Sequence, residues 1–411
     1  MVRRLAVLCL AWVSLALPGQ AQERSFISGD DTLHYVYTPL PVDSTAAAGD
    51  ARQRRDPFFR RLVKYFEGSN VDRTFEKKID FTFAGGPSYS KTTSLGIGLL
   101  AAGLYRLDRT DSVTAPSDVS LFANVSISGV YAVGVTGNTI FSQDRRRLNY
   151  TVMFSSTPRD MWGVGYNAGR YNKPVSYTEK HYLVEANYLY RILPKTYVGT
   201  VLSFEHTAGK KFSDEKQFLD LIYRYGEKTH YTATGLGVIV EYDSRDFIPN
   251  PFRGIYLSFQ ERIFPKGLGN CGKTLWRTMF KANAYQRVWK DCILAADLYA
   301  VFNSEGTPWP MLARLGDNQR MRGYYQGRYA DNSMITMQVE LRQRVWRRIG
   351  CTVWGGAGNV FSSLDRFDWS HTLPNYGLGL RWELKKRVNV RLDYGFGKDT
   401  SSFLLSVNEA F

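Results

Sequence analysis

The chain has 411 residues, a formal net charge of +15, 14% aromatic residues and 36 glycines. This length is enough for two ordinary soluble domains or for one large barrel. Beyond the first 21 residues, no apolar run reaches the roughly 18 residues that a transmembrane helix needs, so a helical membrane protein is excluded. The mean hydropathy of −0.30 is compatible with strands that alternate between apolar and polar faces.

Residues 1–21 have the pattern of a secretory signal peptide. Two arginines precede the apolar run Leu5–Leu17, and small residues surround a cleavage site that we expect after Ala21. The apolar run is too short to span a bilayer as a helix. Cleavage removes two positive charges and leaves a net charge of +13 (15 − 2). For a basic exported protein, the phosphates of anionic lipid or lipopolysaccharide are favoured as partners over nucleic acid.

Residues 22–75 differ in composition from the rest and predict a short periplasmic extension. Within it, Asp56 is suited to cap a helix that has Pro57 at its first position and runs over Phe58–Phe66. One face of this helix is apolar and the other is basic, which suits a membrane surface or the periplasmic mouth of a barrel. Packing of the helix on any apolar surface explains the pattern equally well. The segment is too small for a stable domain of its own.

Residues 76–411 read as strands almost throughout, with a period of two between apolar and polar side chains. The period is clear at 335–344, where apolar residues alternate with Thr, Gln, Glu and Arg. Residues 77–84 alternate as well, and we interpret them as a lead-in. Sixteen strands are predicted after it: 94–106, 118–127, 129–141, 147–156, 160–169, 180–190, 196–206, 231–242, 254–264, 273–287, 291–303, 333–345, 349–358, 374–384, 387–395 and 401–411.

The connections between the predicted strands alternate in length. The long ones follow odd-numbered strands, namely 207–230, 304–332 and 359–373. The tight ones follow even-numbered strands, namely 129–130, 157–159, 289–291 and 385–386, and 243–253 is the exception. Long outer loops and short periplasmic turns are typical of outer-membrane barrels. The sequence therefore predicts an all-β fold, a 16-stranded antiparallel transmembrane β-barrel of the outer membrane with both ends in the periplasm.

The last predicted strand has a further feature. Four of its apolar side chains share one face: Phe403, Leu405, Val407 and Phe411. This arrangement resembles the signal with a terminal aromatic that delivers outer-membrane barrels to their assembly machinery. Glu409 has the same outward parity, at a position where that signal has an aromatic residue.

Three motifs stand at particular places in this pattern. The tripeptide Arg322-Gly323-Tyr324 lies in the long loop between the eleventh and twelfth predicted strands. The strand after it contains Glu340 and Arg342, both on the face that would line the lumen. The third motif occupies the turn between the eighth and ninth strands and comprises Asp243, Arg245, Asp246, Pro251 and Gly254.

In their order along the chain, the three motifs resemble those of the BamA/TamA superfamily, the bacterial surface antigen barrels, and the resemblance covers about residues 77–411. Met321 stands where the family has Val or Ile before the Arg-Gly-aromatic tripeptide, and Gly356 replaces an acidic residue of a neighbouring strand. The family's assembly and secretion proteins also carry periplasmic POTRA modules, for which residues 22–75 are too short. The resemblance implies weak pairing of the first and last strands, with lateral opening toward lipid.

The role of the arginine in the loop motif can also be inferred from electrostatics alone, without the family resemblance. A buried arginine needs a carboxylate partner, since its desolvation is otherwise uncompensated. Glu340 has lumen parity, so we expect an Arg322–Glu340 pair that ties the folded-in loop to the wall, with Arg342 beside it. The replacement of the family's acid by Gly356 leaves the loop held less tightly or by other groups. A solvated loop arginine is the alternative for Arg322.

No catalytic or cofactor chemistry is indicated. The five histidines do not stand at metal-ligand spacing from one another or from cysteines, and the three cysteines after residue 21 are odd in number. We therefore expect a non-enzymatic barrel that assists insertion, assembly or translocation of proteins, in contact with assembly-complex subunits and unfolded barrel proteins. The alternative is a passive pore or a structural partner whose barrel is plugged by its sixth long loop.

Overall fold

The computed structural model describes residues 74–411 except 91–92, 112–113, 115, 224–227, 249 and 386–387. The predicted signal peptide and all but the last two residues of the predicted extension, its helix included, lie outside the described residues. No helix within the described part of the chain is long and apolar enough to cross a membrane.

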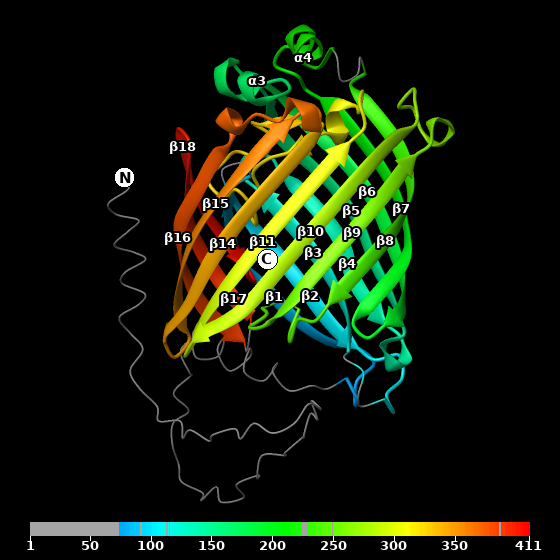
Figure 1. Ribbon diagram of the computed structural model, residues 1–411, viewed down its shortest axis with the longest axis vertical. Coiled ribbons are helices and arrows are strands. Elements are labelled where there is room, and N and C mark those ends of the chain that lie inside the picture. The colour runs from blue at the N-terminus through cyan, green and yellow to red at the C-terminus, as the bar shows by residue number, and fades with distance from the viewer. Residues whose placement is uncertain are drawn as a thin grey trace, which may run out of the picture. The chain divides into compact units, whose positions relative to one another are not determined.

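Sixteen antiparallel strands close into one barrel (Figure 1). Each strand pairs with its neighbour in sequence, except that β11 pairs with β14 and that β1 closes the barrel against β18. The strands are β1 Asp80–Ser90, β2 Ser94–Tyr105, β3 Ser117–Ser126, β4 Tyr131–Ile140, β5 Arg146–Met161, β6 Val175–Leu193, β7 Thr196–Lys210, β8 His230–Asp243, β9 Gly254–Phe264, β10 Leu275–Trp289, β11 Cys292–Asn303, β14 Ser333–Trp346, β15 Ile349–Phe361, β16 Leu373–Lys385, β17 Val388–Gly397 and β18 Thr400–Val407.

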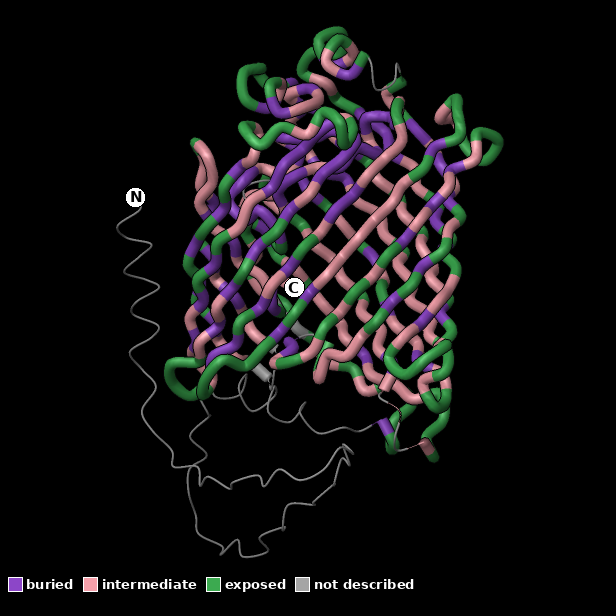
Figure 2. The backbone as a smooth tube through the Cα atoms, viewed as in Figure 1, coloured by how far each residue is buried: buried purple, intermediate pink, exposed green. Residues whose placement is uncertain are grey.

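Alternation along the strands separates an apolar outer surface from a polar lumen. On β14, Met337 and Val339 are exposed on the outer face, whereas Gln338 and Glu340 are buried on the inner face. Large exposed apolar side chains recur on the outer face of most strands, as a lipid-facing wall requires. Figure 2 shows the buried residues gathered toward the end of the barrel that carries α3 (Tyr166–Tyr171) and α4 (Glu215–Ile222).

The predicted number of strands is confirmed, but two of the individual assignments were wrong and offset each other. From residue 80 onward, the lead-in predicted at 77–84 belongs to the first strand, β1. The segments 147–156 and 160–169 were predicted as two strands, yet residues 146–161 form the single strand β5. Pro158 suggested a turn, but it pairs with Thr178 of β6. On the other side of β5, the pairing with β4 does not extend as far as Pro158. This part of β5 is an edge, where the missing N–H of proline is tolerated.

These two errors also exchanged the ends assigned to the first connections. The turn near 129–130 lies at the end of the barrel with the long loops, and the connections 106–116 and 141–145 lie at the opposite end. From β6 onward the predicted sides hold. The elements α3 and α4 cap the long-loop end of the barrel in Figure 1.

The last strand ends earlier than predicted. After Val407, Asn408 adopts φ +66° and the chain turns into the lumen. The carboxylate of Glu409 accepts hydrogen bonds from Arg381 (2.9 Å) and Asn389 (2.6 Å). The outward face predicted for Phe411 and Glu409 is therefore wrong. A carboxylate on that face would meet lipid, whereas in the lumen it meets cations.

The seam between the first and last strands is sparsely paired. Within the described part of the chain its register is given by one residue pair, Tyr89 opposite Leu405, whereas β1 and β2 are aligned through eleven pairs. The ring of Phe403 lies 5.9 Å from that of Tyr89. A side-chain contact thus supplements the short backbone ladder.

Candidate functional site

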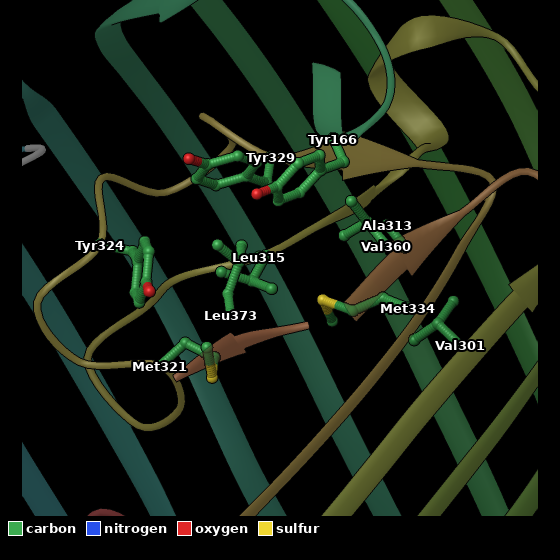
Figure 3. Close-up of a cluster of buried hydrophobic side chains, with 10 residues drawn as sticks. All are labelled: Tyr166, Val301, Ala313, Leu315, Met321, Tyr324, Tyr329, Met334, Val360 and Leu373. Carbon is green, nitrogen blue, oxygen red and sulfur yellow. The ribbon is translucent and has the colours of Figure 1, made fainter. Parts of the chain in front are cut away.

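The long loop between β11 and β14, residues 304–332, folds back over the lumen, and we call it loop 6. Its short strands β12 (Ala313–Arg314) and β13 (Ala330–Asp331) pair with each other. Figure 3 shows apolar side chains of loop 6 packed against barrel strands and α3. Those of the loop are Ala313, Leu315, Met321, Tyr324 and Tyr329, and those around them are Tyr166, Val301, Met334, Val360 and Leu373. Burial of these side chains stabilises the folded-in position of the loop.

Arg322 lies at the centre of the site and is fully buried. One terminal nitrogen of its guanidinium donates to Glu340 on β14 at 2.5 Å, and the other donates to Asp393 on β17 at 2.9 Å. The guanidinium carbon lies 3.6 Å from the ring centroid of Trp354 on β15. Two carboxylates and an aromatic face together compensate the desolvation of this cation. The structure thus brings Arg322 and Glu340 together.

Gly323 and Tyr324 fit the loop backbone against β16 and β17. Gly323 has φ +111°, and a Cβ there would lie 2.7 Å from the carbonyl oxygen of Gly395. Only glycine combines this backbone angle with such a close approach. The hydroxyl of Tyr324 donates to the carbonyl oxygen of Pro374 at 2.7 Å and accepts from the backbone N–H of Lys398 at 2.7 Å.

The second acidic partner of Arg322 is Asp393, a residue that sequence reasoning missed. The expected position, Gly356, has no room for a carboxylate, because a Cβ there would collide with the carbonyl oxygen of Met337 and the side chain of Gln338. Asp393 supplies the missing charge from two strands further on. The sequence signal was present, since Arg391 and Asp393 alternate on the lumen face of a predicted strand.

Around Arg322, charged side chains form one connected group, which we call the lumen network. Glu340 also accepts from Arg342 (2.8 Å), Asp393 also accepts from Arg381 (2.5 Å) and Arg391 (3.1 Å), and Glu409 joins through Arg381. Its members are Arg322, Glu340, Arg342, Arg381, Arg391, Asp393 and Glu409. Each carboxylate serves more than one arginine, so the loss of one member leaves others buried with fewer partners.

Loop 6 is also tied to other parts of the wall. Both terminal nitrogens of Arg314 donate to Glu179 on β6, at 3.0 and 2.7 Å. Arg320 makes a similar two-point contact with Asp297 on β11, at 2.7 and 2.9 Å. Bidentate pairs of this kind fix orientation as well as position. The loop is therefore anchored on three sides of the lumen.

The turn motif lies at the opposite end of the barrel, between β8 and β9. Arg245 contacts the carboxylate of Asp243 through two nitrogens at 2.9 and 2.8 Å, and Asp246 accepts from the backbone N–H of Phe252 at 2.9 Å. Gly254 has φ +113° and packs on the backbone of Ser244. Pro251 is buried in the same turn. These contacts shape the turn, and they do not join it to Arg322.

A family model described as the Omp85 superfamily domain matches residues 119–411, which is more than half of the chain. The chain belongs to the Omp85 superfamily. Omp85 barrels lie in the outer membrane and are non-enzymatic, and the family inserts or translocates proteins there. The resemblance drawn from the three motifs is thereby confirmed at the level of the family.

Solved structures show the same fold at low sequence identity. BamA from Haemophilus ducreyi lacking POTRA domains 1–3 is 12% identical over 81% of this chain and 70% of its own, with a TM-score of 0.55. CdiB from Acinetobacter baumannii is 11% identical over 81% of this chain and 60% of its own, with a TM-score of 0.52. CdiB from Escherichia coli is 11% identical over 81% and 63%, with a TM-score of 0.54. No curated protein matches this chain.

Proposed function

We propose that this Omp85 barrel assists the insertion, assembly or translocation of proteins at the outer membrane, by opening between β1 and β18. The observation that carries the proposal is the asymmetry of the wall. Among the residues that the structure describes, eleven pairs align β1 with β2, but a single pair aligns β1 with β18. A sparsely paired seam costs less to open than any regular ladder, and its free strand edge is able to pair with an incoming strand.

Loop 6 and its anchors support this proposal by holding the rest of the barrel rigid. Arg322 ties the loop to β14 and β17, so the wall beside the seam is braced from inside the lumen. We assign Arg322, Gly323, Tyr324, Glu340 and Arg342 this bracing role, together with Asp393. The turn motif around Asp243 shapes the periplasmic end of the barrel. Phe403 and Leu405 belong to β18, the last strand at the seam.

A disulfide across the seam tests the proposal. Tyr89→Cys and Leu405→Cys are placed opposite each other, in a background with Cys271, Cys292 and Cys351 replaced by Ala. The readout is insertion of an unfolded outer-membrane barrel protein into proteoliposomes that contain the variant. We expect insertion to stop on oxidation and to return on reduction. Equal insertion in both states would contradict the opening of this seam.

A plugged pore or structural partner is the second candidate, favoured by the loop and tail that occupy the lumen. Planar-bilayer conductance distinguishes the two candidates. A plugged pore conducts weakly with loop 6 in place and strongly once loop 6 is deleted, and a crosslink across the seam changes neither conductance. Predicted partners, namely assembly-complex subunits, are tested by a pull-down in mild detergent with and without residues 22–75. We expect their recovery to depend on that segment.

A further inference from the structure

Two neighbouring short turns carry the same residues in the same geometry. Gln-Arg-Val-Trp stands at 286–289, at the end of β10, and again at 343–346, at the end of β14. In both turns the strand pairing shifts at the valine, between Arg287 and Trp289 and between Arg344 and Trp346. A bulge of this kind places two successive side chains on one side of the wall. The two turns are adjacent because β11 pairs with β14.

The exposed apolar side chains of these bulges face the outer surface of the barrel. Trp289 lies opposite Cys292, which shares a face with the outward Leu294. Trp346 lies opposite Ile349, which shares a face with the outward Val353. Opposed residues of an antiparallel pair point to the same side. The tryptophans therefore continue the lipid-facing band toward the short-turn end.

The two turns form one surface. The indole N–H of Trp289 donates to the side chain of Gln343 at 2.8 Å, and Arg344 contacts Asp291 at 2.6 Å. Four large apolar side chains are about half exposed or more on it, with exposed fractions of 49% for Val288, 52% for Trp289, 64% for Val345 and 53% for Trp346. We call this surface the RVW patch: Val288, Trp289, Lys290, Val345, Trp346 and Arg347.

Cations lie at the tips of the same turns. Lys290 and Arg347 are exposed, and neither has a carboxylate partner within the described ranges. The guanidinium of Arg347 lies 5.2 Å from the ring centroid of Trp346. Along the wall the order is therefore apolar side chains, then tryptophan, then cation. The layers of a phospholipid leaflet follow the same order, from acyl chain through the carbonyl region to phosphate.

We propose that the RVW patch is a binding surface for anionic phospholipid of the periplasmic leaflet, with the tryptophans at the level of the lipid carbonyl groups and Lys290 and Arg347 on the phosphates. The short-turn end of an outer-membrane barrel faces the periplasm, where the leaflet consists of phospholipid. The tryptophans lie on the outer face of the wall, in line with its lipid-facing side chains, which favours lipid over a periplasmic protein. Unpaired cations near a surface favour anionic over zwitterionic headgroups.

Tryptophan quenching by brominated lipids tests the proposal. The full chain is reconstituted in bilayers in which dibrominated phosphatidylglycerol or dibrominated phosphatidylcholine replaces part of the unbrominated lipid at equal mole fraction. We expect the phosphatidylglycerol to quench more strongly, with a preference of about fivefold in relative binding constant for each cation. The double variant Lys290→Gln/Arg347→Gln loses the preference, and Trp289→Phe/Trp346→Phe loses the selectively quenched fluorescence.

The double variant Lys211→Gln/Lys216→Gln is the matched control. It removes the same charge from exposed residues at the long-loop end, so the preference stays as in the unchanged chain. A shift in gel mobility on heating verifies that each variant is folded. Equal quenching by both lipids in the unchanged chain, or a preference that survives in Lys290→Gln/Arg347→Gln, overturns the proposal. The first of these results would point to an acidic protein partner for the patch.

Discussion

Arg322 forms ion pairs with two buried carboxylates, more than any other arginine of loop 6. Its replacement by Ala leaves Glu340 and Asp393 buried with one cation fewer. Removal of one partner from a buried ion pair costs about 3–5 kcal/mol, so we expect Arg322→Ala to lower the free energy of unfolding by that amount. Urea unfolding in detergent measures it. Arg366→Ala is the control, because Arg366 is 77% exposed, and a similar loss in both variants would refute the anchor.

Asp331 predicts a pH dependence of loop 6. Burial raises the pKa of its carboxyl to about 6 from an ordinary value of 3.8. The folded loop therefore holds the proton more tightly than the unfolded chain, and its stability falls as the pH rises from about 4 to about 6. We expect slower proteolysis of loop 6 at pH 4.5 than at pH 7. Asp331→Asn removes this difference and stabilises the loop at pH 7 by about 3 kcal/mol.

The comparison between variants isolates the contribution of Asp331. Asp365 is 78% exposed in the next long loop, and Asp365→Asn keeps the pH profile of the unchanged chain. An Asp331→Asn profile that still falls between pH 4 and 6 would assign the dependence to other groups.

The roles of single residues were predictable where a motif and the alternation of its strand agree. They were less predictable where the room available for a side chain determines which residue can occupy a position. Arg322 and Glu340 followed from the motif and from the alternation of β14. Asp393 did not follow, because the family pattern placed the acid at 356. Sequence does not show that the backbone of Met337 fills that site.

At the scale of elements, loop 6 meets β17 backbone to backbone. A Cβ at Gly395 would collide with the carbonyl oxygen of Arg322 and lie 3.0 Å from the backbone nitrogen of Gly323. We expect Gly395→Ala to displace the loop at a cost of about 1–3 kcal/mol. Faster tryptic cleavage within loop 6 and a lower unfolding temperature report this. Gly355→Ala on β15 is the matched control, since its Cβ meets open space. Equal behaviour of both variants would show that the loop does not need this contact.

Elements were predictable from period two, but their ends were not. The single strand β5 was divided because Pro158 reads as a turn, although an edge position accepts it. The last strand was extended because Phe411 continues the alternation in the sequence. The positive φ of Asn408 and the cations that attract Glu409 interrupt that alternation, and both depend on the tertiary structure.

At the scale of the whole molecule, the lumen network connects loop 6 to the chain after the seam strand. Glu409 contacts Arg381, which contacts Asp393, which contacts Arg322. The carbonyl oxygen of Phe411 accepts from Arg342 at 2.9 Å, and Arg342 in turn contacts Glu340. The position of the tail, and through it the end of β18, therefore depends on the same charges that hold the loop.

This connection predicts that loop and tail substitutions are not additive. Arg322 and Glu409 do not contact each other. Arg322 contacts carboxylates of the lumen network, and Glu409 contacts arginines of the same network. We expect the cycle of Arg322→Ala and Glu409→Gln to give a coupling energy above about 0.5 kcal/mol in urea unfolding. Hydrogen exchange at β18 should rise in either single variant, because each loosens the tail.

A second cycle separates this coupling from a general loss of stability. Arg147 and Asp144 form an ion pair of their own at the periplasmic end of β5, with a distance of 2.7 Å, and they share no partner with Arg322. The cycle of Arg322→Ala and Arg147→Ala should therefore be additive within about 0.5 kcal/mol. Additivity in both cycles would mean that the tail is held independently of loop 6. In that case the network would brace the wall without linking the loop to the seam, and the seam would open with loop 6 in place.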